Sequence, residues 1–383
     1  MKRNYIAKRF QNAGSGLTLD TEALAKYKDI IDLSIGDTDF ITDEGIINAA
    51  FRDAKAGYTR YGDPKGDPEL IDAVCRAWQE DFEQKLPHDH VLVSASSCLG
   101  MALVMFSILD PGDEVIVFSP YFPMYRTQIE LAGGVCVDVP TYASEDYAID
   151  EARLRAAITP RTKAIIFNNP TNPTGMAYGN DTLEMLARVA KEYDLLIAAD
   201  EIYTTYLYEG DFRPLRTLPG MAERTITLNS FSKNFLMTGW RVGVIIAEPE
   251  LLEVMNDING SLIYTAPSIS QRAAIHALAM RREIREKYVT AYRDRIFYTA
   301  DRIEKIPYLS LVRPKGTFYL FPGIEKTGLT DDEFCNVLLD KAHVLVSHGK
   351  AFGTAGAEHF RIACTVGIDT LKIAFDRMEK LSF

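Results

Sequence analysis

The sequence predicts an α/β protein with a mostly parallel central sheet covered by helices on both faces, together with a smaller α+β domain. Between about residues 90 and 247, short and continuously apolar runs alternate with segments of helical period. Continuous apolar runs are typical of parallel strands that are buried on both faces. The 383 residues also exceed the length at which one hydrophobic core keeps growing, so two lobes are expected.

The alternating elements follow one another in a regular order. Strands are expected over residues 90–96, 113–119, 134–140, 163–169, 195–203, 225–230 and 242–247. Helices are expected over 98–109, 124–133, 151–158 and 181–193. After Pro267 the pattern becomes helical and charged, and predicts one long connecting helix over 269–306. We therefore expect a large domain over 46–281, and a small domain made of 1–45 together with 282–383.

Composition excludes several classes of function. With 47% apolar and 25% charged residues, the chain is typical of globular proteins, and its net charge of −11 argues against nucleic acid or an anionic membrane as partner. No apolar run is long enough to span a bilayer, and the basic N-terminus lacks the apolar core of a secretory signal. The five cysteines are widely spaced and never form CxxC, which favours reduced thiols and a cytoplasmic location.

Two other kinds of site find no support in the sequence. His88 and His90 stand in "LPHDH" without a cysteine or carboxylate cluster of metal-ligand spacing, so no metal is expected. Neither a GxGxxG turn after a strand nor a GxxxxGK[ST] loop is present, so neither a Rossmann dinucleotide site nor a P-loop is predicted.

Reactive side chains follow the expected strands, at the edge where a parallel sheet binds its ligands. Lys233 is the only charged residue between Arg224 and Arg241, and an amine is costly to desolvate unless it is used. The other residues at this edge offer small polar, thiol, aromatic, amide, carboxylate and phenol groups: Ser97, Cys98, Phe122, Asn172, Asp200, Tyr203 and Ser230.

Together these groups suit pyridoxal 5′-phosphate. A lysine forms a Schiff base with its aldehyde, and a carboxylate keeps its ring nitrogen protonated. An amide and a phenol bond the ring hydroxyl, an aromatic ring stacks on one face, and a helix N-terminus with an arginine holds the phosphate.

The chain resembles the class I/II aminotransferases of pyridoxal-phosphate fold type I over nearly its whole length. The resemblance rests on "YTRYGDPKG", "PYFPMY", "NPTNPTG", "DEIY", "SFSKNFLMTGWRVG" and "FRIA", taken in this order. It implies that Lys233 forms the Schiff base and then shuttles a proton, and that Asp200 partners the ring nitrogen. It further implies a cofactor-binding set in which Tyr203 and Asn172 bond the ring hydroxyl, Phe122 stacks, and Ser97, Cys98, Ser230 and Arg241 hold the phosphate.

The resemblance extends to the substrate and to a second subunit. Arg361 in "HFRIACT" is similar to the arginine that grips the substrate α-carboxylate, and Gly36 and Asn172 are expected to contact the same substrate. Tyr61 resembles the tyrosine that reaches the phosphate in the neighbouring subunit, which implies a homodimer. Two positions depart from the family. Ser96 stands where a glycine is usual and would be strained at positive φ, and His348, which replaces a frequent proline, is expected to fill its loop.

The implied reaction transfers an amino group from an L-amino acid to a 2-oxo acid by a ping-pong mechanism. A C–S β-lyase of the cystathionine β-lyase type shares the fold and the cofactor residues and is the alternative, while a non-catalytic regulator and a nicotinamide dehydrogenase are remote ones. "NGSLIYTAPSIS" contains no arginine for an ω-carboxylate, which favours neutral or aromatic donors.

Overall fold

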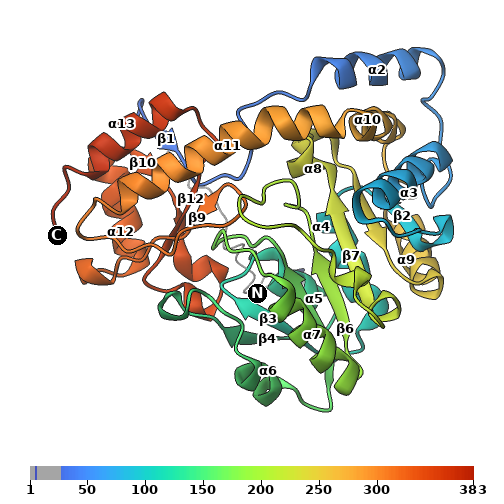
Figure 1. Ribbon diagram of the computed structural model, residues 1–383, viewed down its shortest axis with the longest axis horizontal. Helices are drawn as coiled ribbons and strands as arrows, with labels where there is room; N and C mark the ends of the chain where they lie inside the picture. The colour runs from blue at the N-terminus through green and yellow to red at the C-terminus, as the bar shows by residue number, and fades with distance from the viewer. Residues whose placement is uncertain (1–4, 7–26) are drawn as a thin grey trace.

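The computed structural model describes residues 5–6 and 27–383, and a seven-stranded sheet forms its centre (Figure 1). The strand order is β2-β8-β7-β6-β5-β3-β4. The bounds are Val91–Ser94 (β2), Glu114–Ser119 (β3), Val135–Pro140 (β4), Thr162–Asn168 (β5), Leu196–Asp200 (β6), Thr225–Ser230 (β7) and Gly243–Ile246 (β8). β8 runs in the direction opposite to all the other strands of this sheet, and the remaining neighbouring pairs are parallel. The predicted mostly parallel sheet is confirmed.

Helices cover the sheet on both faces. The helices in this part of the chain are α2 (Glu44–Lys55), α3 (Pro68–Phe82), α4 (Ser97–Ile108), α5 (Met124–Leu131), α6 (Glu151–Ala157), α7 (Asn180–Glu192), α8 (Phe231–Asn234) and α9 (Pro249–Leu262). Among them, α2 packs on α10 (Ser268–Ala279) and not on the sheet. Strand β3 shows why its central residues 115–118 are apolar: Val115 and Val117 pack into one buried cluster, whereas Ile116 and Phe118 pack into another. Burial on both faces keeps these central side chains away from water.

The expectation of one helix over 269–306 is wrong. Helix α10 (Ser268–Ala279) ends at Met280, whose φ and ψ of −98° and 7° leave the α-helical region, and α11 (Arg281–Ile303) begins after it. The guanidinium of Arg281 donates to the Leu278 carbonyl oxygen (3.3 Å) and pairs with acids at the end of α3. Tertiary contacts at this position accompany a break that the helical period of the sequence does not reveal.

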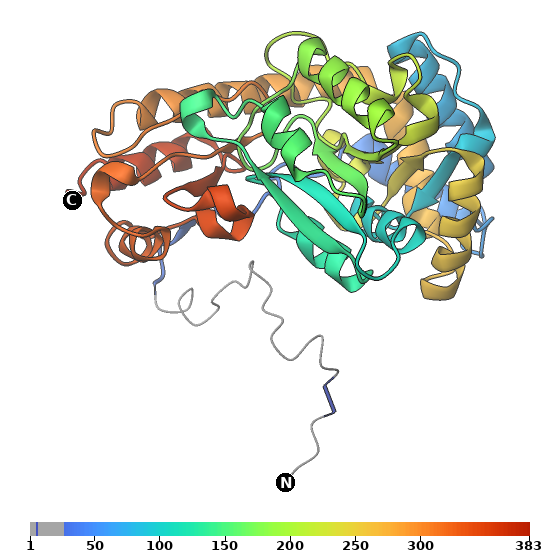
Figure 2. The ribbon, with the colours of Figure 1, turned by 90° about the horizontal axis from the view of Figure 1, so that it is seen from below.

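The C-terminal lobe lies at the far end of α11 from α3 (Figures 1 and 2). Its elements are β9 (Tyr319–Leu320), α12 (Asp331–Val337), β10 (Val344–Leu345), β11 (Ser347–His348), β12 (Phe360–Ala363) and α13 (Ile368–Met378). Strand β1 (Ile31–Asp32) pairs with β10 in parallel, so the N-terminal segment that precedes α2 is joined to this lobe. The rest of the N-terminal part of the domain prediction, residues 1–4 and 7–26, lies outside the described residues.

No helix among the described residues is long and apolar enough to cross a membrane.

Candidate active site

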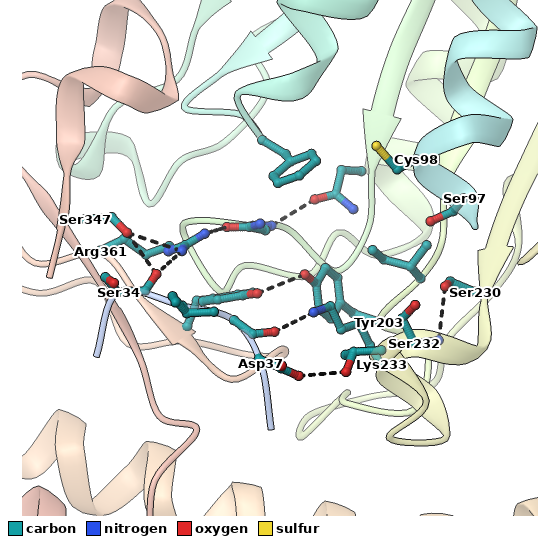
Figure 3. Close-up of a pocket in the computed structure, with 18 of the residues that line it drawn as sticks. Ser34, Asp37, Ser97, Cys98, Tyr203, Ser230, Ser232, Lys233, Ser347 and Arg361 are labelled. Atoms are coloured by element: carbon teal, nitrogen blue, oxygen red, sulfur yellow. Dashed lines mark hydrogen bonds between the residues drawn. The ribbon is translucent and has the colours of Figure 1, made fainter. Parts of the chain in front are cut away.

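A cavity of about 630 Å³ lies at the carboxyl ends of the central strands, facing the C-terminal lobe. All of the predicted site residues except Tyr61 line it, namely Gly36, Ser97, Cys98, Phe122, Asn172, Asp200, Tyr203, Ser230, Lys233, Arg241 and Arg361. Figure 3 shows Ser97 and Ser230 toward one end and Arg361 with Ser347 at the other, with Tyr203 and Lys233 between them. The parallel topology thus brings together residues that are far apart in the sequence.

Lys233 lies in the middle of the cavity on the short helix α8, directly after β7. It is half-buried, and its Nζ donates a hydrogen bond to the backbone carbonyl oxygen of Gly36. Nζ also lies 5.9 Å from the ring centroid of Phe318. Among the described residues no carboxylate forms an ion pair with Lys233, so its amine is held by a neutral acceptor.

Asp200 ends strand β6 and is 7% exposed. Its Oδ2 accepts a hydrogen bond from the hydroxyl of Tyr125, and its Oδ1 is buried with no hydrogen-bond partner in the described part of the chain. Burial raises the pKa of this carboxyl to about 6. A buried acceptor without a donor is costly, so this oxygen calls for a ligand that brings an N–H group, preferably a cationic one. A protonated ring nitrogen meets this requirement.

The end of the cavity that contains Ser97 and Ser230 suits a phosphate group. The backbone N–H groups at the start of α4, at Ser97 and Cys98, are a favourable site for an anion. Ser230 caps α8 by accepting a hydrogen bond from the Ser232 backbone N–H (3.1 Å). Arg241 is exposed, and its Nη1 donates to the Thr238 carbonyl oxygen at 2.8 Å.

Ser96, the N-cap of α4, has φ 97° and ψ 153°, so the strain expected at this position is present. Its Oγ accepts a hydrogen bond from the Leu99 backbone N–H (3.2 Å), which satisfies one free donor of the helix end. Gly243 on β8 is required beside it, because a Cβ atom there would lie 2.6 Å from the backbone nitrogen of Ser97. The phosphate-side loop is therefore closely packed against β8.

Arg361 on β12 is 4% exposed and has no acidic partner within the described residues. Its Nη1 donates to Asn172 Oδ1 (2.9 Å), and its Nη2 donates to the Ser34 carbonyl oxygen (2.5 Å) and to Ser347 Oγ (3.3 Å). Its Nε is buried without a partner in the same part of the chain, and burial lowers the pKa of the guanidinium. A buried cation surrounded by neutral acceptors is matched to an anionic ligand such as a carboxylate.

The structure adds residues that the sequence analysis missed. Tyr125 lies three residues after Phe122, in the first turn of α5, and its place within "PYFPMY" was a usable signal. Tyr319 lies in the apolar run "TFYLF" and gave no signal. His348 lines the cavity, contrary to the expectation that it only fills its loop, and its Nδ1 lies 2.7 Å from Asp332 Oδ1. Tyr61 lies outside the cavity, is 86% exposed and contacts the ring of Tyr264.

The fold and the cavity together define a class of protein, the pyridoxal-phosphate-dependent enzymes of fold type I. The residues present fit that cofactor: an amine is available for its aldehyde, the unpartnered Asp200 Oδ1 for its ring nitrogen, and a helix N-terminus for its phosphate. Within this class, the model of the family "Aminotransferase class I and II" matches residues 28–378, and the chain belongs to this family.

Relatives with different substrates resemble the chain to a similar degree. An aspartate aminotransferase of Pyrococcus abyssi is 36% identical over 93% of this chain and 92% of its own length. An arginine–pyruvate transaminase of Pseudomonas aeruginosa is 34% identical over 93% and 91%. The crystal structure of an aromatic aminotransferase from Pyrococcus horikoshii superposes with a TM-score of 0.90, at 33% identity over 94% and 97% of the two chains.

The chain is therefore a pyridoxal-phosphate-dependent aminotransferase, and the predicted fold, cofactor and reaction class are confirmed. The β-lyase alternative finds no support among these relatives. Their names cover acidic, basic and aromatic donors, so they leave the donor of this chain to be argued from its own cavity.

Proposed function

We propose that Lys233 holds the cofactor and transfers the proton, that Asp200 partners its ring nitrogen, and that Arg361 binds the substrate α-carboxylate. The observation that supports this assignment is that all three line one cavity, in which Asp200 Oδ1 and Arg361 Nε are buried without protein partners among the described residues. Each of these atoms needs a ligand group of a different kind, and a cofactor together with an amino acid supplies both.

The protein's own groups divide the work of the reaction. Pyridoxal phosphate supplies an aldehyde that condenses with amines and a ring that accepts an electron pair. Arg361 and Asn172 fix the substrate carboxylate, which orients the Cα–H bond toward Lys233. The Lys233 amine, once free, would take this proton from Cα and give it to the former aldehyde carbon of the cofactor. Tyr203 and Asn172 hold the ring hydroxyl, Phe122 stacks on the ring, and Gly36 contacts the substrate.

The phosphate is assigned to the backbone N–H groups of Ser97 and Cys98, to Ser230 and to Arg241. The cavity contains only two acidic residues among the described ones that line it, Asp37 and Asp200. A dianion at this end is therefore favoured by the helix N-terminus and by the nearby cation. Amino donor and 2-oxo acid then use the same site in turn, which gives ping-pong kinetics.

The homodimer and the two-domain division are part of the proposal. Tyr61 is 86% exposed and contacts Tyr264, which is also exposed. Tyr58 and Ile263, close to these two residues in the sequence, are exposed as well, and a second copy of the chain would cover them. In such a dimer Tyr61 reaches the phosphate of the neighbouring site. The division into 46–281 and 1–45 with 282–383 is supported by the pairing of β1 with β10. The cytoplasmic location remains our proposal from the cysteine pattern.

Complementation tests the shared site. A Tyr61→Ala chain and a Lys233→Ala chain, each weakly active or inactive alone, should recover part of the activity when refolded together, because one site of each mixed dimer then holds both native residues. No recovery, in a mixture shown by mass to contain mixed dimers, would refute the assignment of Tyr61.

For the amino donor we propose a neutral, large side chain. The wall formed by Ile35, Leu339, Leu345 and Val346 is apolar. The lysine and arginines among the described lining residues are Lys233, Arg241 and Arg361, which the cofactor and the α-carboxylate occupy. A screen of amino donors against 2-oxoglutarate tests this proposal, and a higher kcat/KM for aspartate than for leucine or phenylalanine would overturn it.

The lysine itself is tested by Lys233→Ala. This variant should still bind the cofactor, but reduction with borohydride should no longer fix the cofactor to the protein, and turnover should be lost. Lys163→Ala is the matched control, because Lys163 is exposed at the opposite end of the same sheet. Turnover in Lys233→Ala comparable to that of the control would contradict the proposed role.

A further inference from the structure

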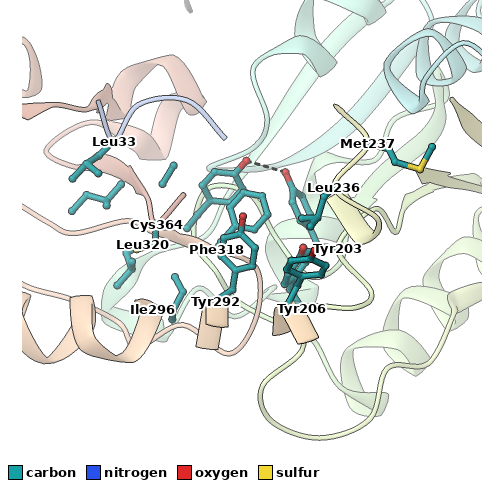
Figure 4. Close-up of a cluster of buried hydrophobic side chains, with 14 of the residues drawn as sticks. Leu33, Tyr203, Tyr206, Leu236, Met237, Tyr292, Ile296, Phe318, Leu320 and Cys364 are labelled. Carbon is teal, nitrogen blue, oxygen red and sulfur yellow. Dashed lines mark hydrogen bonds between the residues drawn. The ribbon is translucent and has the colours of Figure 1, made fainter. Parts of the chain in front are cut away.

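Tyr319 is a buried phenol for which the proposed mechanism has no role. It begins strand β9, is 2% exposed and lines the cavity. Its hydroxyl oxygen lies 3.1 Å from the hydroxyl oxygen of Tyr203, and the two rings meet edge to face at 5.7 Å and 86°. Figure 4 shows the hydrogen bond of Tyr203 at the edge of a buried aromatic cluster that includes Phe318 and Tyr206. This packing leaves the two phenols little freedom to turn away from each other.

The same side chain contacts the substrate end of the cavity. The guanidinium carbon of Arg361 lies 4.6 Å from the centroid of the Tyr319 ring. Gly36 lies against the phenol, since a Cβ atom at position 36 would collide with the Tyr319 hydroxyl and would lie 2.8 Å from its Cζ. The carbonyl oxygen of Gly36 in turn accepts the hydrogen bond of Lys233 Nζ. Tyr319 therefore lies against or near Tyr203, Arg361 and Gly36 at once.

We propose that Tyr319 is a positioning residue that couples the cofactor and substrate subsites: its hydroxyl directs the proton of Tyr203 toward the cofactor, and its ring holds the guanidinium of Arg361. The proposal rests on the roles of Tyr203 and Arg361 proposed above. It assigns separate tasks to the two parts of one side chain, so each part can be removed by itself.

The direction of the hydrogen bond follows from counting protons. Burial raises the pKa of Tyr203 well above its ordinary value, so Tyr203 is neutral and has one proton to donate. Within the pair only one hydroxyl can donate to the other. If Tyr203 gives its proton to the ring oxygen of the cofactor, Tyr319 must donate to Tyr203. Donation from Tyr319 also makes Tyr203 a stronger donor, because hydrogen bonds in a chain polarise one another.

The ring is positioned for its own task. A guanidinium over an aromatic face is attracted by the ring quadrupole, and more strongly where water is excluded. Arg361 has no acidic partner among the described residues. Its guanidinium carbon lies over the ring of Tyr319 and also over the ring of Phe352, 4.9 Å from the centroid of the latter. The stacking leaves the edge of the guanidinium directed at Asn172, Ser347 and the ligand.

The first test is Tyr319→Phe in the cofactor-loaded enzyme, which removes the hydroxyl and keeps the ring. The pH at which the visible absorbance of the lysine-bound cofactor changes should rise by about 0.5–1 unit, the size of one neutral hydrogen bond. It rises because weaker donation from Tyr203 leaves the ring oxygen more basic. In the Tyr203→Phe background the same substitution should produce no further shift, since Tyr319 acts through Tyr203. Tyr308→Phe, which removes a buried hydroxyl bonded to the Met378 carbonyl oxygen, is the control and should shift nothing.

The second test separates the ring from the hydroxyl. Tyr319→Phe should lower kcat and leave KM for both substrates within about twofold, whereas Tyr319→Leu should raise both KM values about thirtyfold, the size of a desolvated cation–π contact. Equal KM values for the Phe and Leu variants would overturn the role of the ring.

The outcomes also separate this proposal from the one it rests on. A wild-type enzyme without a lysine-bound absorbance would refute the roles proposed for Lys233 and the cofactor. A normal wild-type titration with an unshifted Tyr319→Phe variant, or with equal shifts in the wild-type and Tyr203→Phe backgrounds, would overturn only the coupling through Tyr319.

Discussion

Replacing Asp200 by asparagine should stabilise the cofactor-free protein and impair the loaded enzyme. The side chain keeps its shape, and its amide oxygen can still accept the hydrogen bond of Tyr125. The substitution removes the negative charge of a buried carboxylate, one oxygen of which has no hydrogen-bond partner among the described residues. A site that needs a ligand to satisfy its buried charge is expected to lower the stability of the ligand-free protein.

The magnitude follows from the pKa of Asp200, which burial raises from 3.8 to about 6. Below pH 3.8 the carboxyl is neutral in both folded and unfolded protein, and its burial carries no charge penalty. Between pH 3.8 and 6 the folded state keeps a proton that the unfolded state has lost, so stability falls as the pH rises. Above pH 6 the loss is complete, and at 1.36 kcal/mol per unit it amounts to about 3 kcal/mol. Asp200→Asn should recover this amount at pH 8 and almost none at pH 4.

The assay is denaturant unfolding of cofactor-free protein at a series of pH values, with the protomer concentration held constant because dissociation of an oligomer would change the midpoint. Cofactor affinity is measured in parallel. It should fall about tenfold to a hundredfold, because a charge-assisted hydrogen bond to the ring nitrogen is lost. A gain in stability with a loss of affinity from one substitution is the expected signature.

Glu201→Gln is the matched control, since Glu201 is the next residue, is also buried and does not line the cavity. Burial raises its pKa from 4.5 to about 8, so its gain in stability should develop between those two pH values while cofactor affinity stays unchanged. A stability difference for Asp200→Asn that is the same at pH 4 and pH 8 would refute the reasoning, as would an unchanged cofactor affinity.

Two further substitutions test the two ends of the cavity. Arg361→Lys should lower kcat/KM for both the amino donor and the 2-oxo acid about a hundredfold, because a lysine cannot form two parallel hydrogen bonds to a carboxylate. Steady-state kinetics with each substrate varied in turn will check this. An effect on one substrate alone would contradict a shared carboxylate site. Ser96→Gly and Ser96→Ala both lose the bond from the Leu99 N–H, but only the glycine relieves backbone strain worth about 1 kcal/mol. Ser96→Gly should therefore have the higher thermal midpoint of the two variants in calorimetry, and the reversed order would be incompatible with strain at Ser96.

The position of the site was predictable because the topology of the sheet by itself brings its residues to one edge. Once the strands are parallel, their carboxyl ends meet at one edge, and residues that follow them in sequence must gather there. Asp200 pairs in register with Asn168 on one side and with Leu228 on the other, so the polar segments after β5, β6 and β7 begin side by side. The sequence therefore placed Lys233 near Asp200 without any knowledge of side-chain packing.

Features set by tertiary contact were not predictable in this way. The helical period runs through Met280 without interruption, whereas in the structure α10 ends there, next to the contacts of Arg281 with α3. From the sequence, Tyr319 is indistinguishable from an ordinary core residue, because an apolar strand gives no indication of whether the hydroxyl of its tyrosine forms a hydrogen bond. The hydrophobic pattern of a sequence indicates which face of an element is buried, but it does not indicate the hydrogen-bond partner of a buried polar atom.

Gly36 shows how such a contact changes the interpretation of a motif. In "SIGDTDF" the glycine was assigned to substrate contact alone, yet it is also sterically required, because any Cβ atom would displace the phenol of Tyr319. Displacing that phenol would disturb the hydrogen bond to Tyr203 and the stacking under Arg361 together. The small residue is therefore needed for the geometry of the cofactor and substrate subsites alike. A glycine that no turn and no positive φ requires points to a close neighbour, and here this neighbour connects the two halves of the cavity.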